Sequence, residues 1–329
     1  MMTIGLICGT AHQSYSAMTL KVAHNHQVVS PHHKAFEKFK QIMESRTNGE
    51  LKVQIFDSHR FGMAPAYVQA LKLGTLAIAG DSPGNFSQWA PRLNALDLPF
   101  LINDFRDAEA ILTNPIAKEL TGELAKASNS FYWGFQHTGL RLAFTNRPIT
   151  KVEDLKGLKI RTTASKVELA YWKRLGASPI PMAWGEVFTA LQQKTIDGIN
   201  IDVPNSVWVN FNDVCKYAYK TKLSYYPIVF MFSNVVWKKL TPEQQVIVTE
   251  AWREANTWER MMEMGYEADC EGQMAQRGVS FTTPSAQDVE SMKNMTAGLD
   301  NEFPDLFTPE FAAKLRKVVE DDRSLRTWW

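Results

Sequence analysis

Two arginines stand where a guanidinium group could bind an acid. Arg161 ends the stretch 158–161, which alternates as a strand does, and Arg141 follows Thr138-Gly-Leu. A guanidinium group stays charged at any relevant pH and pairs with a carboxylate through two parallel hydrogen bonds. An arginine at a strand end is more often part of a solvated or structural ion pair. The residue types alone leave both interpretations open.

Other polar and aromatic residues stand next to predicted strands or helices. Asn25 follows a predicted strand at 20–24, and Asp81 follows an apolar strand at 76–79, with Asn85 close behind. Asparagine is common in turns after strands, and Asp81 is equally suited to cap the turn at Ser82-Pro83. Trp184 stands at the start of a predicted helix, where most tryptophans serve packing.

Four histidines crowd one short stretch of the chain: His24, His26, His32 and His33. Histidine pairs bind zinc, but no cysteine or acidic pair lies close by to complete a tetrahedral set, so we expect no metal and no cofactor. The chain also lacks the G-x-S-x-G, H-E-x-x-H and phosphate-loop motifs. We therefore predict no catalytic residue and no enzyme.

The composition is that of a globular protein with two domains. The chain has 329 residues, of which 45% are hydrophobic, and 36 basic against 35 acidic residues give a net charge of +1. No basic block stands out, so nucleic acid is not an expected partner. No apolar run is long enough to span a bilayer. Two inert thiols are the preferred interpretation of Cys215 and Cys270, with a disulfide as the alternative.

Strand and helix patterns alternate along the chain, which predicts two α/β lobes with helices on the faces of their sheets. Thr241-Pro-Glu-Gln244 carries the signature of a capping box, and no breaker follows before Gly265. This segment predicts a helix long enough to lie across both lobes, or else two helices joined at Gly265. Thr308-Pro-Glu310 begins a last helix by the same logic.

Several segments resemble the periplasmic substrate-binding proteins of TRAP transporters over nearly the whole chain. Their order and spacing carry the resemblance, above all where Asp154-Leu-Lys-Gly-Leu-Lys-Ile-Arg161 is followed by Gly176-Ala-Ser-Pro-Ile-Pro-Met182 and Glu186-Val-Phe-Thr-Ala-Leu-Gln192. The resemblance implies a two-lobed periplasmic-binding-protein fold, with mixed sheets flanked by helices and a long helix spanning both lobes. Residues 18–140 and about 226–329 are then expected to form lobe I, and 141–225 lobe II.

The resemblance also assigns roles to single residues. Arg161 matches the arginine that holds the ligand carboxylate, and Arg141 matches a second arginine beside it, with a cross-lobe salt bridge as its alternative. Asn25 and Asp81 match polar and acidic ligand contacts, and Asn85 is a weaker neighbour. Trp184 matches an aromatic residue that lies against the ligand.

The sequence departs from the family pattern after Asp197-Gly198. The family tends to read Gln-Glu-Asn-Pro there, whereas this chain reads Ile199-Asn200-Ile201-Asp202-Val203-Pro204. Asn200 and Asp202 are the two candidates for the contact that the family asparagine makes. Because carboxylates accept hydrogen bonds from hydroxyls, Asp81 and Asp202 favour a hydroxyl-rich acid or a zwitterion over a plain dicarboxylate.

The expected function is that of a periplasmic solute receptor. It would bind a small organic acid, with a sugar acid as the best candidate, and pass it as a monomer to the membrane permease subunits of a TRAP transporter. Residues 1–17 are interpreted as a truncated or degenerate export signal. The alternatives are a metal-assisted periplasmic enzyme and a ligand-sensing domain of the same fold.

Overall fold

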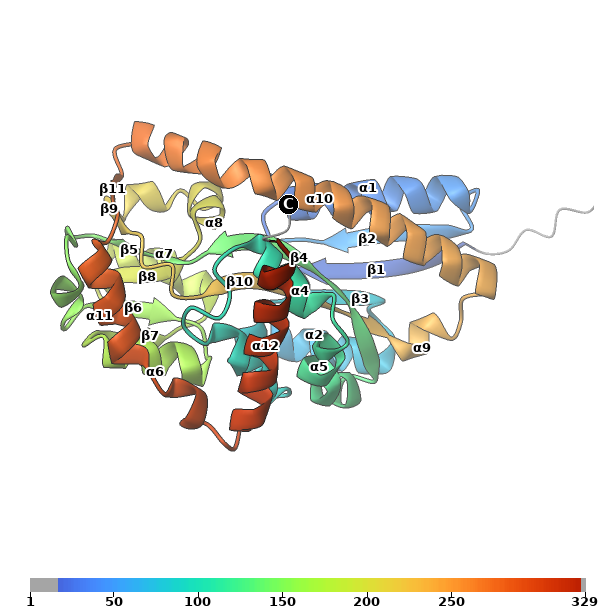
Figure 1. Ribbon diagram of the computed structural model, residues 1–329. Coiled ribbons are helices and arrows are strands. Elements are labelled where there is room, and N and C mark those ends of the chain that lie inside the picture. Colours follow the sequence, from blue (N-terminus) through green and yellow to red (C-terminus); the bar gives the residue numbers. More distant parts are fainter. Residues whose placement is uncertain (1–16, 327–329) are drawn as a thin grey trace, which may run out of the picture.

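The computed structural model describes residues 17–326. Its first sheet has five strands in the order β2-β1-β3-β10-β4 (Figure 1). Their bounds are β1 (Met18–His24), β2 (Leu51–Phe56), β3 (Ile78–Asp81), β4 (Ser130–Leu140) and β10 (Tyr225–Ser233). β1 runs parallel to β2 and β3, whereas β10 runs antiparallel to β3 and β4, so the sheet is mixed, as predicted. We call the part of the molecule around this sheet the first lobe.

The second lobe is built around a six-stranded sheet with the order β11-β9-β5-β8-β6-β7. Its strands are β5 (Leu142–Thr145), β6 (Lys159–Thr162), β7 (Ser178–Pro181), β8 (Gly198–Ile201), β9 (Tyr217–Tyr219) and β11 (Ser280–Thr282). β11 pairs in parallel with β9. The prediction that everything after about residue 226 belongs with lobe I is therefore wrong for β11, because the chain returns to the second sheet at Ser280.

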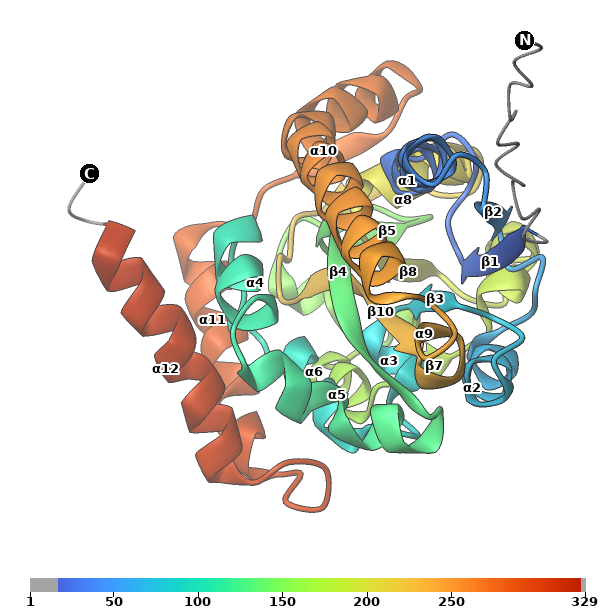
Figure 2. The ribbon, with the colours of Figure 1, turned by 90° about the vertical axis from the view of Figure 1, so that its right-hand side faces the viewer.

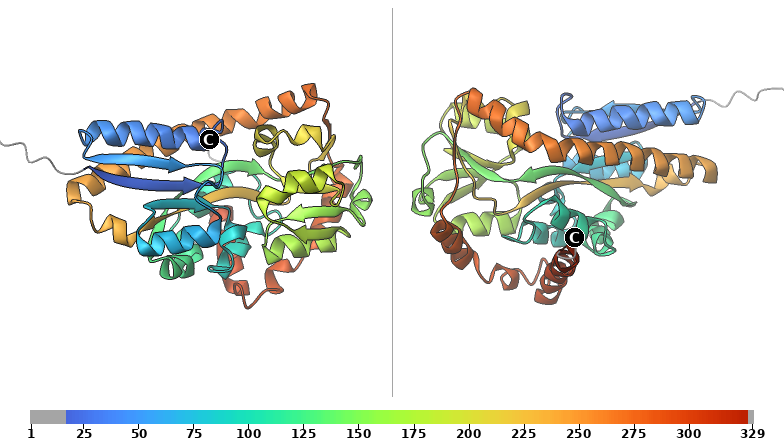
Figure 3. Two further views of the ribbon diagram at one scale, coloured as in Figure 1. Left: turned by 180° about the vertical axis from the view of Figure 1, so that it is seen from behind. Right: turned by 45° about the horizontal axis from the view of Figure 1, so that its top comes forward.

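Helices cover the faces of both sheets, as the views from behind and from above show (Figure 3). The α-helices are α1 (Pro31–Arg46), α2 (Ala64–Leu73), α3 (Pro83–Phe86), α4 (Phe105–Leu112), α5 (Ile116–Ala127), α6 (Lys166–Arg174), α7 (Val187–Gln192), α8 (Val203–Trp208), α9 (Asn234–Trp237), α10 (Pro242–Gln276), α11 (Ala286–Thr296) and α12 (Pro309–Arg326). Short 3₁₀ turns include η1 (Pro91–Asp97) and η3 (Trp184–Glu186). No described helix is both long and apolar enough to cross a bilayer.

The helix α10 runs unbroken along both lobes (Figure 1). Thr241 and Gln244 form the expected capping box, and the helix passes through Gly265, so the two-helix alternative is wrong. Its 35 residues span about 52 Å at the usual rise per residue. Trp252 packs in a core of the first lobe and Met274 in the core of the second. A single continuous helix therefore contributes to the cores of both lobes.

The chain passes between the lobes at several points. β4 leads into β5 at Arg141, and the segment after β9 leads back into β10. After β11 and α11, α12 returns to the first lobe and lies beside α4 (Figure 2). Asp107 of α4 forms ion pairs with Arg323 and Arg326 of α12 there.

The two cysteines of the described chain, Cys215 and Cys270, are buried free thiols, as expected. Burial raises the pKa of each thiol to about 12, so neither is a ready nucleophile. The expected export signal at 1–17 lies, apart from Ala17, outside the described residues.

Candidate functional site

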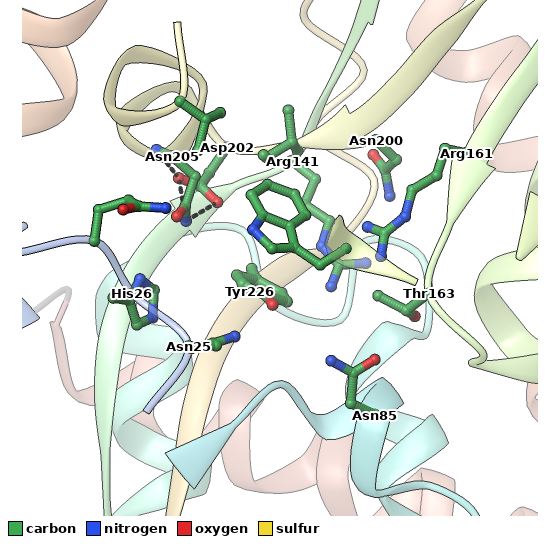
Figure 4. A pocket seen from close by; sticks show the side chains of 14 residues that line it. Asn25, His26, Asn85, Arg141, Arg161, Thr163, Asn200, Asp202, Asn205 and Tyr226 are labelled. Carbon is green, nitrogen blue, oxygen red and sulfur yellow. Dashed lines mark hydrogen bonds between the residues drawn. The ribbon is translucent and has the colours of Figure 1, made fainter. Parts of the chain in front are cut away.

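A pocket lies where the strand ends of both lobes meet (Figure 4). Its empty volume is about 540 Å³, including the part open to solvent. Seven of the predicted site residues line it: Asn25, Asn85, Arg141, Arg161, Trp184, Asn200 and Asp202. The eighth, Asp81, is fully buried and is not among the lining residues.

Arg161 lies in β6, where its guanidinium group is almost fully buried. Its Nε and Nη2 both donate to the carbonyl oxygen of Met182, at 3.1 and 2.9 Å. Within the described part of the chain, no carboxylate lies at ion-pairing distance from it. Burial lowers the pKa of Arg161, although an arginine side chain stays protonated in proteins. The site therefore holds a buried cation that lacks a paired anion.

Arg141 lies between β4 and β5 and is already paired. Its Nη1 is 2.9 Å from Oε1 of Glu168 and 3.5 Å from Oδ1 of Asp97. Glu168 belongs to α6 of the second lobe and Asp97 to η1 of the first lobe, so the cross-lobe salt bridge exists. Burial would lower the pKa of Arg141, but Glu168 and Asp97 together raise it. Arg141 nevertheless lines the pocket, and Figure 4 shows its end close to that of Arg161.

Asp81 holds two asparagines in place. Its Oδ1 accepts hydrogen bonds from Nδ2 of Asn25 at 3.0 Å and from Nδ2 of Asn85 at 2.8 Å. It also accepts the backbone N–H of Ser82 at 2.7 Å, whereas the cap of α3 is Ser82 itself, whose side chain accepts the backbone N–H of Asn85. Burial raises the pKa of Asp81, and the hydrogen bonds from Asn85 and Ser82 oppose that rise. Asp81 therefore positions Asn25 and Asn85, which line the pocket in its place.

Two aromatic rings border the two arginines. The guanidinium carbon of Arg161 lies 5.6 Å from the centre of the Trp184 ring, and that of Arg141 lies 4.3 Å from the centre of the Tyr226 ring. Trp184 begins η3, whereas Tyr226 comes from β10 of the first sheet. The aromatic faces therefore bring both apolar surface and attraction for cations to the pocket.

The segment that differs from the family pattern contributes to the lining of the pocket. Asn200 of β8 donates from Nδ2 to Glu168 at 2.7 Å, while its Oδ1 is buried without a hydrogen-bond partner. Asp202 caps α8 by accepting the backbone N–H of Asn205 at 2.9 Å, and it also accepts the side chain of Asn205. Both predicted candidates line the pocket, and so does Asn205.

Sequence reasoning missed several residues of the site. Glu168 binds Thr163, Asn200 and Arg141 at once, although it carries no motif of its own. The pocket residues that were not predicted as ligand contacts are His26, Gln27, Thr163, Ile201, Asn205, Val209 and Tyr226. Asn205 directly follows Pro204, the last residue of the segment that differs from the family pattern. This position in the sequence is the one signal that could have indicated it.

The histidine cluster divides between two places. His26 lines the pocket, and its ring stacks on that of His32 with 3.8 Å between centroids. Nε2 of His32 faces Glu259 and Glu263 of α10, at 3.4 and 3.6 Å. The expectation that no acidic pair accompanies the histidines is therefore wrong. Glu259 and Glu263 are far from His32 in the sequence, but α10 places them next to it. Burial lowers the pKa of His32 to about 3 and raises the pKa of both glutamates well above the ordinary value.

Comparisons with solved structures agree with this architecture. A sugar-acid-binding protein of Advenella mimigardefordensis, solved in complex with galactonate, superposes with a TM-score of 0.88 over 93% of this chain and 99% of that one, at 23% identity, which shows the shared fold. A TRAP periplasmic solute-binding protein of Polaromonas, bound to D-erythronate, gives a TM-score of 0.83 at 28% identity, covering 91% of this chain and 98% of that one.

Comparisons of the sequence point the same way. The 2,3-diketo-L-gulonate-binding periplasmic protein of Escherichia coli is 30% identical over 94% of this chain and 93% of its own length. The family model described as bacterial extracellular solute-binding protein, family 7 (DctP), matches residues 22–303. This match confirms the resemblance on which the predicted fold and receptor function rest. The chain belongs to family 7 of the bacterial extracellular solute-binding proteins, whose relatives and structural neighbours are TRAP periplasmic receptors.

Proposed function

We propose that this protein is a periplasmic receptor that captures a sugar acid in the pocket between its lobes. One observation carries the proposal: the guanidinium group of Arg161 is buried in the pocket and has no paired carboxylate among the described residues. A buried unpaired charge is costly, and a ligand carboxylate would offset that cost through two parallel hydrogen bonds. The same charge would reject ligands that lack an anion.

The rest of the pocket suits hydroxyl groups. The side-chain oxygens of Asn25 and Asn200 are buried without hydrogen-bond partners, and the Asp202 carboxylate lines the same pocket. Such oxygens accept hydrogen bonds, and hydroxyl groups donate them. Trp184 offers a flat surface to the carbon face of the ligand. Relatives that bind 2,3-diketo-L-gulonate, galactonate and D-erythronate support the choice of a polyhydroxylated acid.

We further propose that the receptor works by capture, closure and delivery. The carboxylate binds at Arg161, and groups from the other lobe, such as Asn25 and Asn85, then complete the contacts. A ligand favours closure only through its higher affinity for the closed state. The closed monomer would deliver the acid to the permease subunits of a TRAP transporter in the membrane. No chemical step is assigned to the pocket, so the bound acid should be recovered unchanged.

The test replaces Arg161 with Met and measures binding of galactonate, D-erythronate and succinate by calorimetry. We expect wild-type protein to prefer a hydroxylated acid, and Arg161→Met to lose about 100-fold or more in affinity, since it removes a charge-paired contact. The melting temperature of the ligand-free protein should stay equal or rise. Arg147→Met is the control, because Arg147 is exposed and should bind ligand normally.

Two outcomes would reject the proposal. Unchanged affinity in Arg161→Met would show that the carboxylate is bound elsewhere. A large drop in the melting temperature of the ligand-free variant would show that Arg161 serves the fold through its bonds to Met182.

A further inference from the structure

Three ionisable side chains meet where α1 of the first lobe touches the middle of α10. His32 lies in the first turn of α1, and Glu259 and Glu263 lie one turn apart on α10. The Nε2 atom of His32 is 3.4 Å from Oε1 of Glu259 and 3.6 Å from Oε1 of Glu263. The three ligand-type atoms all lie within 4.8 Å of one another.

The two glutamates have few partners. Their side chains are 0% and 2% exposed, and apart from His32 the backbone of His137, which acts on Glu259, is the one hydrogen-bonding group of the described chain recorded beside them. No lysine or arginine of the described chain forms an ion pair with either one. Two buried carboxylates with so few donors around them are costly unless a cation or protons occupy the space between them.

We propose that His32, Glu259 and Glu263 bind a divalent transition-metal ion, with Zn²⁺ as the preferred occupant. Ligand atoms about 2.0–2.1 Å from a tetrahedral zinc ion lie about 3.4 Å apart, close to the two separations found here. One imidazole and two carboxylates form a donor set that suits zinc, whereas Ca²⁺ and Mg²⁺ need more oxygen ligands. Three protein ligands leave a fourth position for water.

The surroundings allow such an ion to enter and to be held. Glu263 lines a second cavity of about 640 Å³, including its open part, separate from the one at Arg161. The ring of His26 lies parallel to that of His32, at 6°, and fixes its plane. Nε2 of His32 now lies 2.5 Å from the carbonyl oxygen of His137, while Nδ1 has no partner. Metal binding would move the imidazole proton to Nδ1 and replace the contact with His137.

The ion would serve a purpose different from solute capture. It would tie the start of α1 to the midpoint of the helix that spans both lobes. We therefore expect it to raise the stability of the protein without occupying the pocket at Arg161. The proposal does not depend on the identity of the solute, so it stands or fails independently of the receptor function.

The experiment adds Zn²⁺ to protein that has been freed of metal with a chelator, and it measures binding by competition with a chromogenic chelator and by thermal shift. We expect one saturable site and a higher melting temperature with Zn²⁺, and neither effect with Mg²⁺ or Ca²⁺. Glu259→Gln and Glu263→Gln should each weaken zinc binding by about 100-fold, since each removes one of three ligands. Because glutamine keeps the shape without the charge, the metal-free variants should remain folded.

Two controls separate this site from its neighbours. Asp269→Asn alters an exposed carboxylate of the same helix and should bind zinc as the wild type does. His33→Asn removes a partner of His24, whose Nε2 lies 3.3 Å from Nδ1 of His33, and should also leave zinc binding unchanged. The proposal is overturned if zinc binding follows His33 instead of Glu259 and Glu263. It is equally overturned if wild-type protein binds no zinc, since protons then occupy the carboxylates.

Discussion

Arg141 and Glu168 form a buried ion pair beside the pocket, with 2.9 Å between Nη1 and Oε1. Both side chains are almost fully buried, and the pair joins the link between the two sheets to α6 of the second lobe. Arg161, by contrast, has no paired carboxylate in the described chain. Mutation of Arg141 should therefore lower the stability of the ligand-free protein, whereas mutation of Arg161 should not.

Arg141→Met should destabilise the ligand-free protein as well as weaken binding. It leaves Glu168 buried without its cation, and breaking a buried pair on one side costs about 3 kcal/mol or more. Urea denaturation without ligand measures this cost. The double variant Arg141→Met/Glu168→Gln removes both charges of this pair and should recover part of the lost stability, because Asp97 still lacks its cation. Equal stability of Arg141→Met and wild type would contradict the structural role of the pair.

Gly84→Ala should weaken ligand binding by keeping the lobes apart. Gly84 of α3 lies against Thr163 of the second lobe, and a Cβ atom there would be 2.4 Å from Oγ1 of Thr163. Because Gly84 lies in α3 outside the left-handed region, the variant is free of backbone strain. We expect roughly a tenfold loss of affinity, about 1.4 kcal/mol, measured by calorimetry.

The control for this variant is Gly122→Ala, since a Cβ atom at residue 122 meets nothing within 4 Å. It should bind ligand as the wild type does and be slightly more stable, because alanine has a higher helix propensity than glycine. Unchanged affinity in Gly84→Ala would show that the approach of α3 to Thr163 is not required for binding.

The attachment of α12 should depend on pH through Asp107. Burial alone would raise the pKa of Asp107, but the hydrogen bonds from Arg323 and Asn103 and the charge of Arg326 lower it overall. A carboxyl group whose pKa is lowered by folding adds stability above its unfolded pKa, near 4, and loses that contribution as the pH falls through the folded value. Acid should therefore loosen the contact between α12 and α4.

Urea denaturation of wild type and Asp107→Asn at pH 6 and pH 3 tests this expectation. At pH 6 the variant should be less stable by about 2 kcal/mol, the usual contribution of a hydrogen bond to a charged group. At pH 3 the difference should shrink. A difference that stays constant between the two pH values would mean that the ionised carboxylate is not what holds α12.

Local signals in the sequence were enough to place the elements that are defined by their own residues. The capping box at Thr241 marks the start of α10, because the residues that cap a helix are neighbours in sequence. The third strand was expected at 76–79 but lies at Ile78–Asp81, since a continuous apolar run has no alternation that fixes its ends. The short strands β9 and β11 were missed, because pairing between distant segments creates them.

The residues of the candidate site were likewise predicted where a local sequence pattern marks them and missed where only the fold brings them together. Arg161, Trp184 and Asn200 were found because each belongs to a recognisable segment, and all three line the pocket. Glu168 was missed, since a glutamate in the first turn of a helix is ordinarily a solvated residue that favours the helix dipole. Glu259 was missed for a related reason: only the passage of α10 across the lobes brings it to His32. A contact between residues so far apart in the sequence leaves no local sequence pattern.

The place of β10 in the first sheet has a consequence for the order in which the protein can form. β10 lies between β3 and β4 and pairs with both, although it comes much later in the chain. A chain that emerges N-terminus first, from a ribosome or a translocation channel, cannot close this sheet until Ser233 is free. All of the second sheet except β11 has emerged by then. The lobe that begins the chain is therefore among the last parts to be completed.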